Sequence, residues 1–128
     1  MFGMPDDASF DMLYDNLKHQ ETISFWSTSF LRGTTLDDAI VIVDECQNLN
    51  FHELDSIITR VGQDSKIVFC GDVNQSDLQR TNERNGILDF QRILEGMDEF
   101  SMVEFGINDI VRSGLVKSYL ISKMSLGL

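Results

Sequence analysis

The chain has 128 residues, with 21 acidic residues against 10 basic ones, so its formal net charge is −11 at pH 7. A hydrophobic content of 42% is enough to bury the core of one compact domain and excludes an intrinsically disordered chain. No apolar run approaches the roughly 18 to 20 residues that span a bilayer, and the N-terminus lacks the basic-then-apolar order of a signal peptide. The acidity also disfavours nucleic-acid binding by electrostatic attraction alone, because that binding needs clustered Lys and Arg.

The first thirty residues carry only short patterns. We expect residues 1–9 to form an extended lead-in, and a short helix to follow from Phe10, because apolar side chains then recur at three-four spacing. Alternation over residues 23–25 predicts a strand. We therefore divide the chain into a lead-in with a short helix, residues 1–22, and a main domain, residues 23–128.

Two apolar runs predict the central strands. Residues 39–43, Ala-Ile-Val-Ile-Val, and residues 67–70, Ile-Val-Phe-Cys, are short, rich in β-branched side chains and free of alternation. This pattern is typical of parallel strands that are buried on both faces. The cysteines in and after these runs, Cys46 and Cys70, show no metal-ligand spacing. We expect reduced, mostly buried thiols of an intracellular protein rather than a disulfide.

The segment between the two strands predicts a helix. Asn50 and Glu53 have the spacing of a capping box, an apolar stripe runs from Phe51 to Val61, and Gly62 is placed to end the helix. Strands that alternate with helices predict an α/β fold, with a three-layer parallel sheet covered by helices on both faces. The remaining elements expected in chain order are a surface loop at 76–85, a helix at 86–97, a third strand at 102–105, and a last helix from Asn108 with Leu115, Tyr119 and Leu120 facing inward.

Polar residues follow both predicted strands. Asp44 and Glu45 end the first strand, and Gly71 and Asp72 end the second, with amide side chains such as Gln75 just beyond. The carboxyl ends of adjacent parallel strands meet at one edge of the sheet, where ligands bind in such folds. A first carboxylate at this edge can hold Mg²⁺ and its water, and a second can polarise an attacking water.

The polar segments resemble, in order, those of the PhoH-like family, a branch of the P-loop NTPases close to superfamily 1 helicases. Asp-Glu-Cys-Gln-Asn at 44–48 is similar to the family's Walker B segment, Asp-Glu-Ala-Gln-Asn. Further likenesses are Arg-Gly-Thr-Thr-Leu at 32–36, Thr-Arg-Val-Gly at 59–62 with Ser-Lys at 65–66, Gly-Asp-Val-Asn-Gln-Ser-Asp-Leu at 71–78, Asn-Gly-Ile at 85–87, and Asp-Ile-Val-Arg at 109–112. The likeness covers residues 23–121 and implies that the main domain is the C-terminal part of a RecA-like ATPase core.

The resemblance implies a role for each matching residue. Asp44 would hold Mg²⁺, Glu45 would activate the hydrolytic water, and Asp72 would help to bind the nucleotide. Gln75 and Arg112 would contact the γ-phosphate of ATP. Arg32 and Arg60 would each be either an arginine finger offered to a neighbouring subunit or a surface salt-bridge residue. Two residues depart from the family pattern: Cys46 replaces an alanine, and Thr34 replaces the second arginine of Arg-Gly-Arg-Thr, so no role can rest on that charge here.

One motif of the family has no counterpart in the sequence. A Walker A loop, Gly-x-x-x-x-Gly-Lys-Ser/Thr, occurs nowhere in the 128 residues, so the backbone cradle and the lysine for the phosphates are missing. We therefore expect a split-gene product, a gene product truncated at its start, or a decayed remnant, which hydrolyses ATP weakly or not at all alone. If it is active, it needs a Walker A-bearing chain or its own oligomer. The resemblance also implies RNA as a partner, no membrane, and a cytoplasmic site, which is the host cytoplasm if a phage encodes the protein.

Two other classes of function are consistent with the residues. A metal-dependent nuclease would use Asp44, Glu45 and Asp72 as metal ligands and would need no phosphate-binding loop. A non-catalytic interaction module would pack through a sheet edge or through helix faces that the rest of the chain leaves uncovered.

Overall fold

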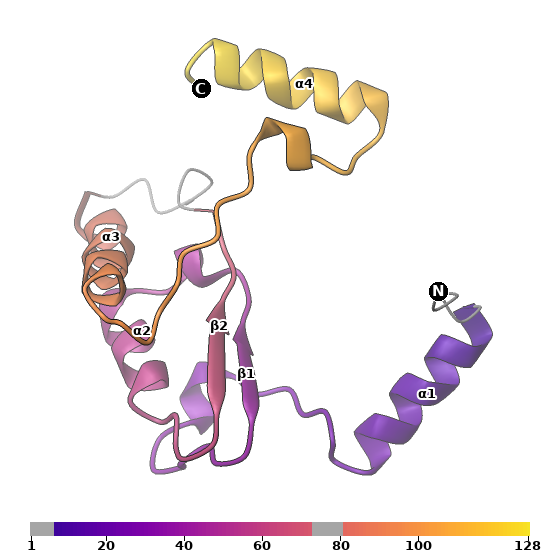
Figure 1. The fold of residues 1–128 in the computed structure, drawn as a ribbon, viewed down its shortest axis with the longest axis vertical. Helices are drawn as coiled ribbons and strands as arrows, with labels where there is room; N and C mark the ends of the chain where they lie inside the picture. Colours follow the sequence, from indigo (N-terminus) through magenta and orange to yellow (C-terminus); the bar gives the residue numbers. More distant parts are fainter. Residues whose placement is uncertain (1–6, 73–80) are drawn as a thin grey trace. The chain divides into compact units, whose positions relative to one another are not determined.

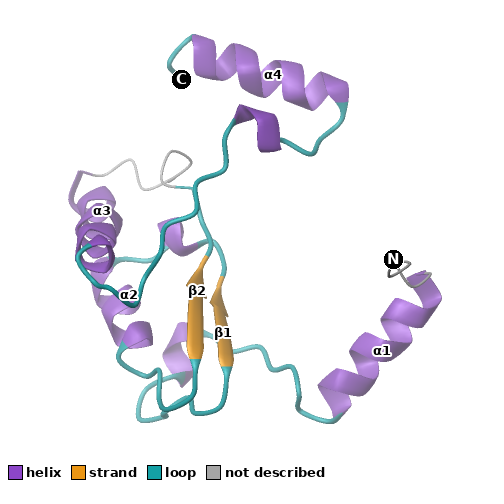
Figure 2. Ribbon diagram, in the orientation of Figure 1, coloured by secondary structure: helices purple, strands orange, loops and turns teal. Residues whose placement is uncertain are grey.

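Residues 7–72 and 81–128 are described by the computed structural model, and within them the side chains of 8–72 and 86–128. The chain divides into two compact units, Met1–Phe90 and Gln91–Leu128. The elements in chain order are α1 (Asp7–His19), η1 (Thr28–Phe30), β1 (Ile40–Val43), η2 (Cys46–Asn48), α2 (Phe51–Ile58), β2 (Lys66–Phe69), α3 (Thr81–Glu95), η4 (Ile107–Asp109) and α4 (Gly114–Ser125). Helices and strands alternate from α1 to α3, and in the described residues α4 follows α3 with a short 3₁₀ turn but no strand between them (Figure 2).

The sheet of the first unit consists of β1 and β2, which run parallel (Figure 1). Ile40 pairs with Lys66 at one end of the register, and Val43 pairs with Phe69 at the other. A parallel pair needs a crossover connection, and α2 lies within it. The predicted α/β class and the predicted parallel pairing are therefore confirmed.

Helix α2 and the part of α3 up to Phe90 lie over one face of this sheet (Figure 1). Their apolar side chains are buried there. The Phe90 ring meets the Phe69 ring of β2 edge-on, with centroids 5.1 Å apart, and the Phe51 ring of α2 at 6.4 Å. Successive side chains of a strand point to opposite faces, so only every second strand residue joins this core. The buried apolar residues of the first unit are Leu31, Val43, Cys46, Leu54, Ile57, Ile87 and Phe90.

The other face of the sheet is open to solvent. The residues that point to this face are exposed: the solvent-exposed fraction is 75% for Ile40, 67% for Ile42 and 47% for Val68. Within the first unit, the prediction that both strands are buried on both faces is therefore wrong, and the three-layer arrangement is not confirmed. A continuous apolar run suits two covered faces, but the described residues of the first unit supply a covering layer for only one of them.

Helix α2 begins as predicted and ends earlier. The Asn50 side chain accepts a hydrogen bond from the Glu53 N–H at 2.9 Å, and the Glu53 carboxylate accepts one from the Asn50 N–H at 2.9 Å, so the capping box is confirmed. The helix ends at Ile58 with Thr59 as its C-cap, and Val61 already forms a parallel bridge with Leu36. The prediction that Gly62 ends the helix is therefore wrong, because pairing with the segment before β1 extends the chain first.

The N-terminal helix is confirmed, although α1 begins at Asp7, so residues 7–9 are helical rather than extended. The strand predicted at 23–25 is wrong. This segment pairs with no strand among the described residues: the Ile23 N–H donates to the Leu17 carbonyl at the end of α1 at 3.3 Å, and Phe25 is 73% exposed. Alternation alone does not make a strand, because the backbone groups of an isolated extended segment pair with water instead.

Several predictions for the C-terminal part are corrected. Helix α3 begins at Thr81, so residues 81–85 are helical rather than part of a loop, and residues 76–80 of that loop lie outside the described residues. The strand predicted at 102–105 is wrong, because it is unpaired in the described chain and Phe105 is 80% exposed. Short apolar runs of this kind lack the partner that would make them strands.

The last helix, α4, begins at Gly114 rather than at Asn108. Leu115 and Tyr119 are exposed and Leu120 is half-buried, so the predicted inward-facing stripe is wrong. The apolar side chains of α4 are spread around the helix, and no single face is set apart for burial. None of the described helices has the length and apolar character needed to cross a bilayer.

Candidate functional site

The two strand ends meet at the carboxyl edge of the sheet, as predicted. The Cys70 N–H donates a hydrogen bond to the Val43 carbonyl at 2.8 Å, and the Cys46 N–H donates one to the Cys70 carbonyl at 3.0 Å. These bonds continue the pairing beyond the last strand residues. The Asp44-Glu45 and Gly71-Asp72 turns therefore lie side by side.

Asp44 and Glu45 both expose their side chains at this edge. The Asp44 carboxylate accepts a hydrogen bond from the Glu45 N–H at 3.0 Å. Glu45 itself has left-handed backbone angles, φ 52° and ψ 38°, at the start of the η2 turn. This conformation costs a non-glycine residue about 1–2 kcal/mol, and strain of this kind often occurs at functional sites.

A buried glutamine joins the two turns. Gln47 is 4% exposed, and its Nε2 donates a hydrogen bond to Glu45 Oε2 at 2.5 Å. Its Oε1 accepts a hydrogen bond from the Asp72 N–H at 3.2 Å. Sequence reasoning gave this residue no role, since its place in the Asp-Glu-Cys-Gln-Asn segment does not reveal that its side chain is buried between the two turns.

The second turn lies close enough to the first that only glycine fits at position 71. A Cβ atom on Gly71 would lie 2.5 Å from Gln47 Oε1 and 2.7 Å from Cys46 Sγ. Real Cβ atoms do not approach other atoms so closely. The absence of a side chain at position 71 is therefore what lets the two turns pack together.

The two thiols lie beneath this edge, and both are free, as expected. Burial raises the pKa of the Cys46 thiol above its ordinary value of 9.0, and the neighbouring Cys70, Asp44 and Glu45 raise it further against a lowering hydrogen bond from the backbone. Cys46 is therefore a neutral thiol near pH 7. The nucleophile and metal ligand of cysteine chemistry is the thiolate, so Cys46 acts as a small packing residue.

The edge can take part in holding a nucleotide-bound Mg²⁺. Among the described side chains, no three His, Cys, Asp or Glu residues gather in a way that could hold a metal ion. Mg²⁺ in nucleotide sites takes only one or two carboxylates, with water and phosphate oxygens as the other ligands. The exposed Asp44 carboxylate, next to a second exposed carboxylate at Glu45, fits that requirement.

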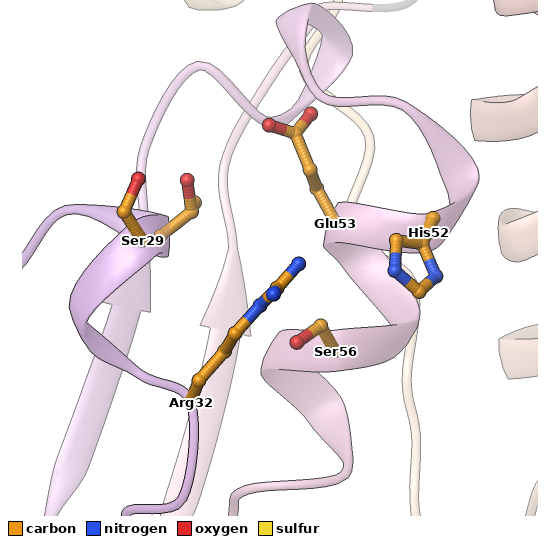
Figure 3. Close-up of a pocket in the computed structure, with 6 residues that line it drawn as sticks. Ser29, Arg32, His52, Glu53 and Ser56 are labelled. Carbon is orange, nitrogen blue, oxygen red and sulfur yellow. The ribbon is translucent and has the colours of Figure 1, made fainter.

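Arg32 lies in a pocket beside α2 rather than at the strand ends. The pocket has a volume of about 370 Å³, and the guanidinium of Arg32 points towards the face of α2 that carries Glu53 and Ser56 (Figure 3). Arg32 is exposed. The pocket is lined by Thr28, Ser29, Arg32, His52, Glu53 and Ser56.

Arg60 lies at the opposite edge of the sheet from Asp44. Its carbonyl accepts a hydrogen bond from the Leu36 N–H at 2.8 Å, in the segment that leads into β1. Arg60 is half-buried, and its Nε is a buried side-chain nitrogen without a hydrogen-bond partner among the described residues. The structure therefore does not bring Arg60 together with the Asp44-Glu45 turn.

The last two candidates are not placed at the site by the structure. Arg112 is exposed and belongs to the second unit, whereas Asp44 belongs to the first. Gln75 lies outside the described residues, whereas Asp72 is half-buried beside Gln47.

Comparison with known proteins identifies the family. Residues 7–122 match the family model described as PhoH-like protein. The chain belongs to the PhoH-like family. It is 37% identical over 114 residues to the PhoH-like protein of Bacillus subtilis (strain 168), with 86% of this chain and 35% of that protein covered. The PhoH-like protein of Mycobacterium leprae (strain TN) is 37% identical over 114 residues, with 86% and 32% covered, and Protein PhoH of Escherichia coli (strain K12) is 34% identical over 92 residues, with 72% and 26% covered.

Membership in the PhoH-like family makes this chain a relative of the P-loop NTPases. The chain spans about a third of the length of the curated PhoH-like relatives that it matches. Two of its family-like segments form the amino edge of the sheet, where Leu36 bridges Val61 and the Ser65 hydroxyl donates to the Leu36 carbonyl at 2.8 Å. The Asp-Glu-Cys-Gln-Asn segment at 44–48 lies at the carboxyl edge instead, which is the edge that carries the candidate site.

Proposed function

We propose that this chain supplies the Mg²⁺-binding and water-activating part of an ATP-hydrolysing site, whose phosphate-binding loop lies outside these 128 residues. The observation that carries the proposal is the meeting of the Asp44-Glu45 and Gly71-Asp72 turns at the carboxyl edge of a parallel sheet. Two exposed carboxylates on adjacent residues, above a buried strand end, suit a metal-bound phosphate and an attacking water.

Each residue then has one task. The Asp44 carboxylate would hold Mg²⁺, and the ion would neutralise charge on the phosphates of ATP. The Glu45 carboxylate orients the attacking water and accepts its proton. Asp72, Gln75 and Arg112 contribute on the nucleotide side, where an amide and a guanidinium stabilise charge that develops on the γ-phosphate.

The open face of the sheet is the surface on which the loop-bearing polypeptide docks. Ile40, Ile42 and Val68 leave an apolar face uncovered on a parallel sheet, a type of sheet that is normally covered on both faces. The matched region covers only 35% of the Bacillus subtilis relative, so that relative contains additional polypeptide that could cover this face. Docking of a Walker A-bearing segment would complete the three-layer RecA-like core and bring the loop to the carboxyl edge.

The family also guides the setting of the reaction. We propose that the protein uses ATP hydrolysis to act on RNA. We also propose that it lies in the cytoplasm, or in the host cytoplasm if a phage encodes it. This part of the proposal rests on kinship with helicase-related NTPases, and an RNA-stimulated rate of ATP hydrolysis would test it.

The central experiment measures ATP hydrolysis with Mg²⁺, using the chain alone and the chain mixed with the part of the Bacillus subtilis relative that lies outside the matched region. We expect little or no hydrolysis by either part alone and clear hydrolysis by the mixture. Glu45→Gln should abolish it, whereas Glu53→Gln, on an acid that caps α2, should leave it intact.

Two results would overturn the proposal. Hydrolysis by the mixture that persists in Glu45→Gln would remove the catalytic role of Glu45. Full hydrolysis by the chain alone would show that no external loop is needed.

Docking is tested by binding of the two parts. Ile42→Lys places a charge on the open face and should weaken association at least tenfold. Phe25→Lys, at a residue that is 73% exposed but lies outside the sheet, is the matched control and should leave association unchanged. Equal effects of the two variants would exclude the sheet face as the docking surface.

A further inference from the structure

Gln47 contacts both halves of the candidate site through a single buried side chain. Its Nε2 donates to the Glu45 carboxylate at 2.5 Å, and its Oε1 accepts from the Asp72 N–H at 3.2 Å. Gln47 is 4% exposed, and it is the buried polar residue of the described chain. Burying an amide is costly unless its groups are hydrogen-bonded, so both contacts matter to the fold.

The Glu45 carboxylate is held from two directions. The backbone of Glu45 has left-handed angles, so its side chain leaves the chain in a different direction from that of a residue with helical or extended angles. The Gln47 amide then binds one of its two oxygens. An exposed glutamate would otherwise sample many rotamers, and fixing it in one geometry removes that freedom before any water is bound.

We propose that Gln47 is a positioning residue, which holds the Glu45 carboxylate in the orientation needed for water activation and ties that orientation to the Gly71-Asp72 turn. The inference rests on the proposed function, because it assigns Glu45 as the base. It adds a residue that acts through Glu45 and makes no contact with the nucleotide.

The close approach of Gly71 supports this role. A Cβ at position 71 would lie 2.5 Å from Gln47 Oε1, so a glycine is needed for the second turn to reach the amide. Gln47 thereby transmits the position of the Asp72 backbone to the Glu45 carboxylate. A shift of either turn changes the geometry of the other through this one side chain.

The hydrogen bond itself can be tested without nucleotide. In NMR spectra of the full chain, the side-chain amide protons of Gln47 should be shifted downfield and protected from exchange with water. Glu45→Ala should remove the downfield shift, while Glu53→Ala, which alters a carboxylate bonded to Asn50, should not. An unprotected Gln47 amide, or one that is insensitive to Glu45→Ala, would overturn the inference whether or not ATP is hydrolysed.

The positioning role is tested in the mixture that hydrolyses ATP. Gln47→Glu keeps the size of the side chain and the acceptor for the Asp72 N–H, but it replaces the donor with a carboxylate that repels Glu45. We expect kcat to fall by about 10- to 100-fold, the usual effect of removing such a supporting contact, with KM for ATP nearly unchanged. Gln47→Met, which removes both hydrogen bonds, should lower kcat at least as much.

The outcomes separate the two proposals. Unchanged kcat in a folded Gln47→Glu variant, with the wild-type mixture active, would overturn the positioning role and leave the proposed function standing. A rise in KM with kcat unchanged would assign Gln47 to nucleotide binding and would also overturn it. No hydrolysis by the wild-type mixture would reject the proposed function, and the positioning role would fall with it.

Discussion

The Cys46 N–H donates a hydrogen bond to the Cys70 carbonyl across 3.0 Å, one step beyond the last pair of the parallel sheet. This bond holds the Walker B-like turn against the end of β2, directly beside Glu45 and Gln47. The side chains of these two hydrogen-bonded residues lie beneath the site: the Cys46 thiol is buried and the Cys70 thiol is half-buried. The geometry of the site therefore depends on residues that take no chemical part in it.

The first prediction concerns the pH dependence of stability. Burial, aided by the nearby Cys70, raises the pKa of Cys46, so the folded chain holds this proton more tightly than the unfolded chain. The resulting stability is fully present below the ordinary thiol pKa of 9.0, which the unfolded chain has, and is lost as the pH rises towards the folded pKa. Cys46→Ala should therefore flatten the fall in the free energy of unfolding above pH 8, as measured by urea denaturation. An unchanged slope would contradict the assignment.

The second prediction concerns the close packing of the two turns. Gly71→Ala would push a Cβ atom against Gln47 Oε1 and Cys46 Sγ, so we expect a loss of about 1–3 kcal/mol in the free energy of unfolding. Gly114→Ala is the control, because an added Cβ there meets no atom within 4 Å and alanine favours the start of α4. Comparable urea midpoints for the two variants would show that the turns can separate without cost.

The third prediction concerns the start of α2. Asn50→Ala removes the side-chain acceptor for the Glu53 N–H and should lower the free energy of unfolding by about 1 kcal/mol. Asn50→Asp keeps the acceptor and should change it little. Thermal melting of the wild type and both variants checks this. Equal melting temperatures for the wild type and Asn50→Ala would mean that the capping box contributes nothing to stability.

The fourth prediction concerns the end of α1. The Thr22 N–H donates to the Leu17 carbonyl at 2.9 Å and the Glu21 N–H to the Lys18 carbonyl at 3.1 Å, which is a Schellman motif with Glu21 in the left-handed position. Glycine is favoured there, so Glu21→Gly should raise the helicity of a peptide covering α1, a gain of about 0.5–1 kcal/mol. Glu21→Ala keeps the strain and should give no gain. Lower helicity for the glycine peptide than for the wild type, measured by circular dichroism, would contradict the motif.

Local signals in the sequence were read correctly where neighbouring residues suffice to decide the structure. The capping box of Asn50 and Glu53 involves residues three apart, and the apolar runs around Ile42 and Val68 mark strands by their β-branched side chains. The same reasoning failed at residues 23–25 and 102–105. Each has a pattern compatible with a strand, but a strand exists only where another segment supplies the hydrogen bonds.

The candidate site divides in the same way. Its carboxylates, Asp44 and Glu45, were evident from the sequence because a charged pair that ends an apolar run stands out. The role of Gln47 was not evident, since nothing in the residue types shows that its amide is buried between two turns. The position of Arg60 was also beyond the sequence, because only the bridge from Leu36 to Val61 places it at the far edge of the sheet.

The sequence by itself determined the α/β class, the parallel order of the strands, the acidic strand end and the PhoH-like family, because these depend on residue type, local spacing and ordered motifs. The tertiary structure alone decided that one sheet face is open, that Gln47 links Glu45 to Asp72, and that Gly71 must lack a side chain. Those features depend on which segments far apart in the chain come into contact. Burial and hydrogen bonding between such segments are properties of the packed chain, and no local pattern encodes them.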